Sequence, residues 1–201
     1  MKIEKLGLSE MRALYDTRMK EDFPPSELRP WHSMETLTQQ GNYLCFGYKE
    51  GDRVLAYAAF ARSPEAALLD YYAVDASLRG QGVGQRFLGG LKDLSHQFGA
   101  PFVLIEVESV ETGKTPEEKE LRQRRIRFYE HCGCRRSGTG SLLFGVEYQI
   151  MYLPLDQVEP QDSQVKESLE QIYRMIVTPL VQGDSRRYEQ ACQVFLRENG
   201  T

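Results

Sequence analysis

The chain has 201 residues, of which 41% are hydrophobic and 27% are charged. This balance is typical of a globular protein that can bury a substantial core, either as one domain with an appendage or as two very small domains. Lys and Arg number 25 against 29 Asp and Glu, so the formal net charge is -4. Because duplex nucleic acid is bound through a net-basic surface, we expect no nucleic-acid partner.

Membrane, secretion and metal signals are weak. No run approaches the roughly 20 consecutive apolar residues of a membrane helix, and the first ten residues lack the apolar segment of a secretory signal. Four cysteines are too few and too scattered for a disulfide framework. His131-Cys132-Gly133-Cys134 suggests zinc ligands, but structural zinc sites use four ligands and no second pair of this kind follows. We therefore expect a cytoplasmic protein without a metal or a membrane partner.

The N-terminal part is predicted to form two helices followed by strands. Apolar residues at helical spacing predict a helix that begins with Ser9 as its cap and ends at the prolines of 22–25. A shorter helix is predicted over 33–41. Residues typical of strands then predict β structure, with a turn at 50–52, over the ranges 43–48, 54–61 and 67–74.

The remaining elements alternate helix and strand. A helix over 84–98, a strand over 101–109 and a helix over 116–131 are predicted, the last because Thr115-Pro116-Glu117-Glu118 has the form of a capping box. Residues 142–155 read as two short strands or one bent strand. After a polar linker, apolar spacing predicts two amphipathic helices, one from 165 to 176 and one from 188 to 196. The expected fold is α/β (α+β), with a domain over 1–155 and a two-helix extension over 156–201.

The most informative segment joins the strand at 67–74 to the following helix. It contains three alternating glycines, Gly80, Gly82 and Gly84, at the point where the helix begins. Glycines let a backbone approach a ligand closely, and a helix start presents unpaired N–H groups to an anion. The dinucleotide pattern G-x-G-x-x-G fails in both registers, because Gln85 or Phe87 stands at the last glycine, and the Gly-Lys-Ser/Thr of a P-loop is absent.

Arg79-Gly80-Gln81-Gly82-Val83-Gly84 resembles the Arg/Gln-x-x-Gly-x-Gly/Ala signature of the GCN5-related N-acetyltransferase (GNAT) superfamily. The resemblance implies a mixed, mostly antiparallel sheet with splayed strands, flanked by helices. It also implies acetyl-CoA as co-substrate, with pyrophosphate bound by backbone amides and pantetheine beside the preceding strand. The coenzyme-binding residues implied in this way are Tyr72, Ala73, Val74, Arg79, Gly80, Gln81, Gly82, Val83, Gly84 and Gln85.

The resemblance also implies catalytic roles. The Val74 N–H would polarise the thioester carbonyl, an oxyanion-type role. A carboxylate on the strand over 101–109 would accept a proton from the attacking ammonium; Glu106, between two apolar residues, is a better candidate than Glu108. Tyr129, in a segment similar to the family's Tyr-x-x-x-Gly-Phe element, would donate a proton to the leaving thiolate. In this sequence Cys134 replaces the phenylalanine and Arg122 replaces an asparagine that often contacts pantetheine.

The predicted activity is direct transfer of an acetyl group from acetyl-CoA to a primary amine of a small molecule or peptide. The resemblance places the acceptor near 23–31, with Asp70 and Tyr148 or Tyr152 as further lining residues. The alternative is a non-catalytic acyl-CoA-binding sensor of the same fold; a dinucleotide-binding enzyme is disfavoured by the glycine spacing. The C-terminal helices pack on the core, form a lid or form a homodimer interface.

Overall fold

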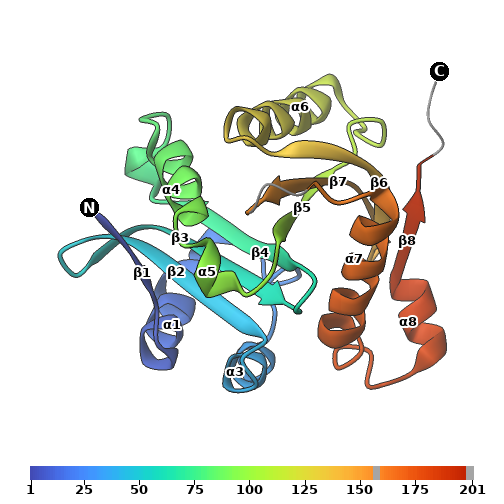
Figure 1. Ribbon diagram of the computed structural model, residues 1–201, viewed down its shortest axis with the longest axis horizontal. Coiled ribbons are helices and arrows are strands. Elements are labelled where there is room, and N and C mark those ends of the chain that lie inside the picture. The colour runs from blue at the N-terminus through green and yellow to red at the C-terminus, as the bar shows by residue number, and fades with distance from the viewer. Residues whose placement is uncertain (156–158, 198–201) are drawn as a thin grey trace. The chain divides into compact units, whose positions relative to one another are not determined.

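The computed structural model of the protein describes residues 1–155 and 159–197 (Figure 1). Its chain divides into two compact units, the first of residues 1–62 and 69–94, the second of residues 63–68 and 95 onward. In the first unit the elements are β1 (Lys2–Lys5), α1 (Leu8–Leu14), the π-helical segment η1 (Tyr15–Met19), α2 (Lys20–Asp22), α3 (Trp31–Gln39), β2 (Tyr43–Glu50), β3 (Arg53–Arg62), most of β4 (Ala67–Val74), the 3-10 turn η2 (Ala76–Leu78) and α4 (Val83–Lys92).

The second unit contains the remaining elements. In chain order these are α5 (Ser95–Phe98), β5 (Phe102–Glu108), α6 (Pro116–His131), β6 (Arg135–Leu143), β7 (Val146–Pro154), α7 (Asp162–Val177), α8 (Ser185–Ala191) and β8 (Cys192–Leu196). Both units are defined by packing, so the division into 1–155 and 156–201 stays a prediction. The polar linker predicted after 155 falls partly on 156–158, outside the described residues.

Hydrogen bonds join the strands in the order β1-β2-β3-β4-β5-β7-β6-β8. The ladder between β4 and β5 is parallel. It pairs Ala67 with Val103 and Leu68 with Leu104. The ladders of β2 with β3, β5 with β7 and β6 with β7 are antiparallel. The predicted fold class, a mixed and mostly antiparallel sheet flanked by helices, is confirmed.

Within the first unit, helices cover both faces of the strands. Figure 1 shows α4 on one face and α1 with α3 on the other. The ring of Phe87 on α4 stacks on Tyr48 of β2 and on Tyr72 of β4, with 5.7 Å between ring centroids in both pairs. Phe87 is fully buried. This packing fixes the beginning of α4 next to the end of β4, the junction that the glycine loop forms.

Within the second unit, α7 packs against β6 and β8, while α6 packs against β5. Figure 1 shows α6 and α7 on opposite faces of these strands. The cap predicted for α6 is confirmed, since the Thr115 hydroxyl accepts a hydrogen bond from the Glu118 N–H and Pro116 opens the helix. Helix α7 confirms the first predicted C-terminal helix, whose apolar residues are buried.

The structure corrects several predicted elements. Residues 192–196 form strand β8, which pairs antiparallel with β6, so the second predicted C-terminal helix ends at Ala191. The helix predicted over 84–98 is interrupted, with α4 ending at Lys92 and α5 beginning at Ser95. Strand β1 was missed, because its residues are mostly polar and exposed. The cap of α1 is Gly7, whose N–H donates to the Glu10 carboxylate, and Ser9 lies inside the helix.

Candidate active site

Asp75 stabilises the loop between β4 and α4 through hydrogen bonds of its carboxylate. The Asp75 carboxylate accepts hydrogen bonds from the Ser77 hydroxyl (2.6 Å) and the Ser77 N–H (3.0 Å), and Arg53 donates to its other oxygen at 2.9 Å. The Ser77 hydroxyl and Arg53 lower the pKa of this carboxyl well below its ordinary value. Asp75 therefore caps the turn η2 as an anion and sets the direction in which the chain leaves β4.

Two glycines turn the backbone over the beginning of α4. Gly80 and Gly82 have φ of +76° and +73°, in the left-handed region that favours glycine. A Cβ on Gly82 would lie 3.1 Å from a guanidinium nitrogen of Arg86, whereas a Cβ on Gly80 would meet open space. Gly82 is the N-cap residue of α4, and its left-handed conformation lets the helix begin with its first N–H groups facing outward.

The first amides of α4 have no partner within the described part of the chain. Arg79 N–H and Gln81 N–H donate to the carbonyls of Ala76 and Leu78, both at 3.4 Å, and the helical ladder begins with Arg86 N–H on the Gly82 carbonyl at 3.1 Å. Between these groups, no hydrogen bond within residues 1–155 and 159–197 uses the N–H groups of Gly80, Gly82, Val83, Gly84 or Gln85. Such a set of outward N–H groups at the positive end of a helix is suited to an anion.

The predicted strand residues lie directly beside this loop. The Tyr72 hydroxyl donates to the Gly84 carbonyl at 2.6 Å, which ties β4 to the first turn of α4. Val74 accepts a hydrogen bond from Arg79 Nε on its carbonyl at 3.2 Å. Ala73 is buried between them. All ten predicted coenzyme-binding residues are therefore brought together within the first unit.

Glu106 and Tyr129 belong to the second unit. The half-buried Glu106 on β5 accepts a hydrogen bond from the hydroxyl of Tyr173, a fully buried residue of α7. The Tyr129 hydroxyl, on α6, makes no hydrogen bond with any residue that the structure describes. Burial raises the pKa of this phenol, and the adjacent Cys134 thiol raises it further. Tyr129 thus keeps its proton at neutral pH.

The comparison with family models decides the classification. Residues 8–134 match the model described as the acetyltransferase (GNAT) family, which is more than half of the chain. The chain belongs to the GNAT family. This confirms the predicted family and the predicted enzyme class, an acyltransferase.

Individual proteins and solved structures are also similar to this chain. The chain is 25% identical over 164 residues to YjbC of Bacillus subtilis (strain 168), whose name describes an acetyltransferase, and the match covers 80% of both chains. A GNAT-family structure from Bacteroides thetaiotaomicron has a TM-score of 0.65 at 20% identity, covering 88% of this chain and 98% of that one. The structure of yncA from Salmonella typhimurium, with its cofactor acetyl-CoA, has a TM-score of 0.55 at 18% identity, covering 81% and 98%.

The arginines of α6 in this GNAT protein are largely committed to internal contacts. Arg122 donates to the Ser109 carbonyl at 2.7 Å and lies 3.6 Å from the Glu108 carboxylate. Arg125 donates to the same carboxylate at 3.1 Å, and Arg127 pairs with Glu120 at 2.6 Å. Glu108 is therefore a structural partner of α6, and the role of Glu106 as base stays a prediction.

Asp70, predicted to face the acceptor, is instead part of a buried polar cluster in the first unit. Arg29 Nε lies 3.2 Å from one of its carboxylate oxygens, and the Tyr43 hydroxyl donates to that same oxygen at 2.6 Å. Arg29 is itself buried. Because its charge is neutralised by Arg29, the Asp70 carboxylate is not a free receptor for a cationic amine.

Two residues that form a hydrogen-bonded chain with Glu106 were not predicted from the sequence. Tyr173 and Ser141 are both fully buried, and their hydroxyl oxygens lie 2.9 Å apart. Tyr173 lies four residues after Leu169, so the sequence indicates that it belongs to the buried face of α7. A buried tyrosine hydroxyl usually has a polar partner, which is the signal that could have pointed to this residue. Nothing in the local sequence identified Glu106 as that partner, since the two residues are 67 positions apart.

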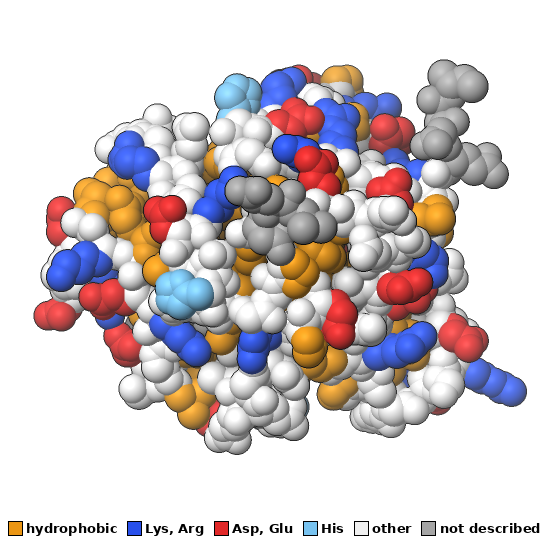
Figure 2. All heavy atoms as spheres, in the orientation of Figure 1, with side chains coloured by type: hydrophobic (Ala, Val, Ile, Leu, Met, Phe, Trp, Pro, Cys, Tyr) orange, Lys and Arg blue, Asp and Glu red, His pale blue; other side chains and the backbone are white. Residues whose placement is uncertain are grey.

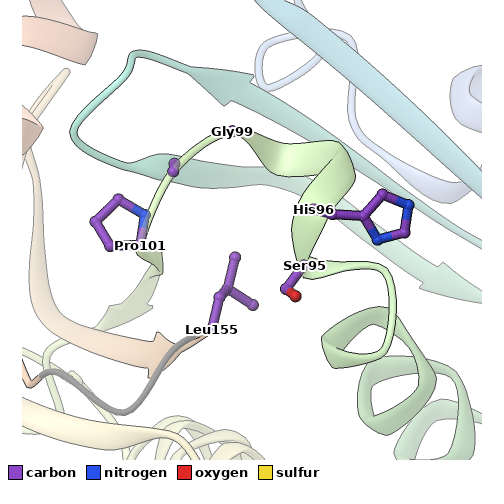
Figure 3. A pocket seen from close by; sticks show the side chains of 6 residues that line it. Ser95, His96, Gly99, Pro101 and Leu155 are labelled. Carbon is purple, nitrogen blue, oxygen red and sulfur yellow. The ribbon is translucent and has the colours of Figure 1, made fainter.

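A surface hollow lies away from the predicted site residues. A hollow of about 390 Å³ is lined by Ser95, His96, Gly99, Ala100, Pro101 and Leu155, and Figure 3 shows His96 turned away from Leu155. None of the predicted site residues lines it, and the described chain stops at Leu155 before resuming at 159.

Charged side chains and potential metal ligands occur throughout the described part of the chain. The face in Figure 2 carries acidic and basic side chains interspersed. Over the described ranges no three His, Cys, Asp or Glu residues gather as metal ligands, and none of the helices there has the length and apolarity needed to span a membrane.

Proposed function

We propose that this GNAT protein transfers the acetyl group of acetyl-CoA to a primary amine of a small molecule or peptide. The observation that carries the proposal is the set of uncommitted N–H groups at Gly80, Gly82, Val83, Gly84 and Gln85. Had these amides been paired internally, the loop could not bind a diphosphate through its main chain. The acetyl-CoA bound to the similar yncA structure supports the same ligand.

The residues of the loop fit this coenzyme. The N–H groups at the start of α4 would hold the pyrophosphate, and the exposed Arg86 has no ion pair among the described residues and adds a positive charge. The backbone of Tyr72, Ala73 and Val74 would bind the pantetheine arm. When bound, the coenzyme supplies a thioester-activated acetyl group.

Three residues of the chain would serve the transfer. The Val74 N–H would hydrogen-bond the acetyl carbonyl oxygen, where negative charge develops. Glu106 would take the proton that the ammonium must lose before its nitrogen can attack, and the Tyr129 hydroxyl would give a proton to the sulfur. Overall a C–N bond forms, the thioester C–S bond breaks, and the products are an amide and a free thiol. The uncommitted Tyr129 hydroxyl is available for this step.

The proposal extends to the setting of the reaction. All four cysteines are reduced and buried, which supports the reducing environment of the cytoplasm. Residues 1–155 would form the acetyltransferase domain, and 156–201 an extension that packs on it or contributes to a homodimer. The acceptor class is a primary amine, carried by a small molecule or a peptide.

A binding assay and a thiol assay test the proposal together. Acetyl-CoA at 100 times its dissociation constant should stabilise the protein by about 2.7 kcal/mol in a thermal-shift experiment, whereas NAD should not. A panel of amines should then reveal release of free thiol with at least one acceptor. Stabilisation by NAD alone would refute the assignment. Binding of acetyl-CoA without thiol release across the panel would favour the non-catalytic sensor.

A further inference from the structure

The C-terminal helix α7 brings a buried hydroxyl to the candidate base. Tyr173 is fully buried, and its hydroxyl donates a hydrogen bond to Glu106 Oε1. The same hydroxyl oxygen lies 2.9 Å from the Ser141 hydroxyl on β6, which is also fully buried. The chain of groups runs Ser141, Tyr173, Glu106. It ends on the half-buried carboxylate, the only one of the three groups with access to solvent.

The direction of the two hydrogen bonds follows from the number of protons. A tyrosine hydroxyl carries one proton, and an ionised carboxylate can only accept. Tyr173 therefore gives its proton to the bond with Glu106 and accepts the bond from Ser141. Hydrogen bonding to the charged form of a carboxyl favours that form, so this arrangement stabilises ionised Glu106. Burial and the charge of Glu106 raise the pKa of Tyr173, which keeps the phenol protonated as the donor.

The position of α7 is fixed independently of this contact. Its first residue, Asp162, accepts a hydrogen bond from the Gly138 N–H at 2.7 Å on its carboxylate, and its carbonyl accepts one from the Thr139 hydroxyl at 3.1 Å. Apolar side chains along α7 are buried as well. The helix therefore presents Tyr173 at a defined place, although it lies beyond the 8–134 region that the family model matches.

We propose that Tyr173 is a positioning residue that keeps the Glu106 carboxylate ionised and oriented to accept the proton of the amine. This inference rests on the proposed function, in which Glu106 is the base. It assigns the C-terminal extension a part in the chemistry of the acetyltransferase. Ser141 supports the role by occupying the second hydrogen-bonding position of the Tyr173 oxygen.

Other titratable groups of the second unit also lie near Glu106 or its partner Tyr173. From β7, Tyr148 contributes to the electrostatic environment of Tyr173. From β5 and α6, Glu108 lies close along the strand, and its carboxylate is shared by Arg122 and Arg125. Arg122 and Arg125 offset the charge of Glu108, whereas Tyr173 is bonded directly to the Glu106 carboxylate, so its removal should change the titration of Glu106.

The test is the pH dependence of kcat/KM in the full-length Tyr173→Phe variant. Loss of the donor should raise the pKa of Glu106, so the acidic limb should move to higher pH by about one unit. At pH values below the acidic limb, kcat/KM of the variant should be about tenfold lower than that of the wild type. At high pH the two values should become equal. Ser141→Ala should shift the limb in the same direction by less. Tyr188→Phe removes a hydroxyl from α8 that interacts with Cys192 and should leave the limb in place.

A second measurement does not depend on turnover. Carbon-13 NMR of the Glu106 carboxyl should show an upward pKa shift in Tyr173→Phe and a smaller upward shift in Ser141→Ala. An active wild-type enzyme with an unshifted limb and an unshifted Glu106 pKa in both variants would overturn the inference alone, as would higher activity in Tyr173→Phe, which would indicate that Tyr173 masks the base. A wild-type protein that binds acetyl-CoA and acetylates no amine would overturn the proposed function, and the inference with it.

Discussion

Arg29 and Asp70 form a buried ion pair that ties the loop before α3 to strand β4. Their closest atoms, Arg29 Nε and Asp70 Oδ2, are 3.2 Å apart. The Arg29 N–H also donates to the Tyr71 hydroxyl at 2.7 Å, and the Tyr71 hydroxyl donates to the Glu27 carbonyl at 2.9 Å. The segment that the family resemblance assigns to the acceptor side is thus fixed to the strand that carries the predicted pantetheine-binding residues.

Breaking the Arg29–Asp70 pair should destabilise the fold strongly. Removing one partner leaves the other charge buried without this ion pair, so Asp70→Asn and Arg29→Met should each lower the free energy of unfolding by about 3 kcal/mol. The double variant should cost less than the sum, because it leaves no unpaired charge. Denaturant unfolding of the three variants measures this coupling. Additive losses would show that the pair does not act as a unit.

Gly82 and Gly89 should respond in opposite directions to the same substitution. Gly82 has φ of +73° and a neighbouring Arg86 nitrogen at 3.1 Å from a built Cβ, so Gly82→Ala should lower stability by about 1–2 kcal/mol. Gly89 lies inside α4 with open space around its Cβ position, so Gly89→Ala should raise stability by up to about 1 kcal/mol.

Acetyl-CoA affinity separates the two glycine variants further. Gly82→Ala should weaken binding, because the altered turn moves the N–H groups at the start of α4, whereas Gly89→Ala should bind as the wild type does. Thermal-shift titration with acetyl-CoA provides both measurements. Equal effects of the two substitutions on affinity would contradict a role of this turn in holding the pyrophosphate.

The local parts of the fold were predictable and the long-range parts were not. Thr115 and Pro116 encode the beginning of α6, and the glycines near 80 encode the turn before α4, because each signal lies within a few residues of the structure it forms. Strand β8 depends on pairing with β6, more than 40 positions earlier, so Val194 and Phe195 form a strand where local spacing favoured a helix.

The candidate site shows the same division. Its loop residues could be predicted because the family motif, the turn-forming glycines and the helix start coincide in one segment. The ion pair between Arg29 and Asp70 and the hydrogen bond between Tyr173 and Glu106 join residues that are far apart in the sequence. No pattern in a single sequence predicts such pairs. The catalytic roles of Val74, Glu106 and Tyr129 stay predictions.

Tyr129→Phe should reduce turnover far more than coenzyme binding. A positioned general acid contributes roughly 100-fold to 10,000-fold, so kcat should fall by at least about 100-fold while the acetyl-CoA dissociation constant changes little. Burial raises the pKa of the Tyr129 phenol, so its ionisation should produce no basic limb in the pH profile between about pH 6 and 9. An unchanged kcat would remove Tyr129 from the mechanism, whereas a basic limb in that range that disappears in the variant would contradict the raised pKa of the Tyr129 phenol.

Asp75 should contribute a pH-dependent part of the stability. Its pKa is lowered in the folded state by the Ser77 hydroxyl and by Arg53, so the folded protein holds this proton less tightly than the unfolded chain does. The sign follows from linkage: stability from Asp75 is complete above its unfolded pKa of about 3.9 and is lost as the pH falls toward its folded pKa. Asp75→Asn should therefore have a lower free energy of unfolding than the wild type at pH 7. This difference in unfolding free energy should become smaller below about pH 4. Chemical unfolding at a series of pH values measures it, and Asp52→Asn serves as the control because this carboxyl is exposed and lies in the β2–β3 turn, outside the glycine loop. A difference between Asp75→Asn and wild type that stays constant from pH 7 to pH 3 would show that the capping hydrogen bonds, rather than the charge, hold the turn in front of the glycine loop.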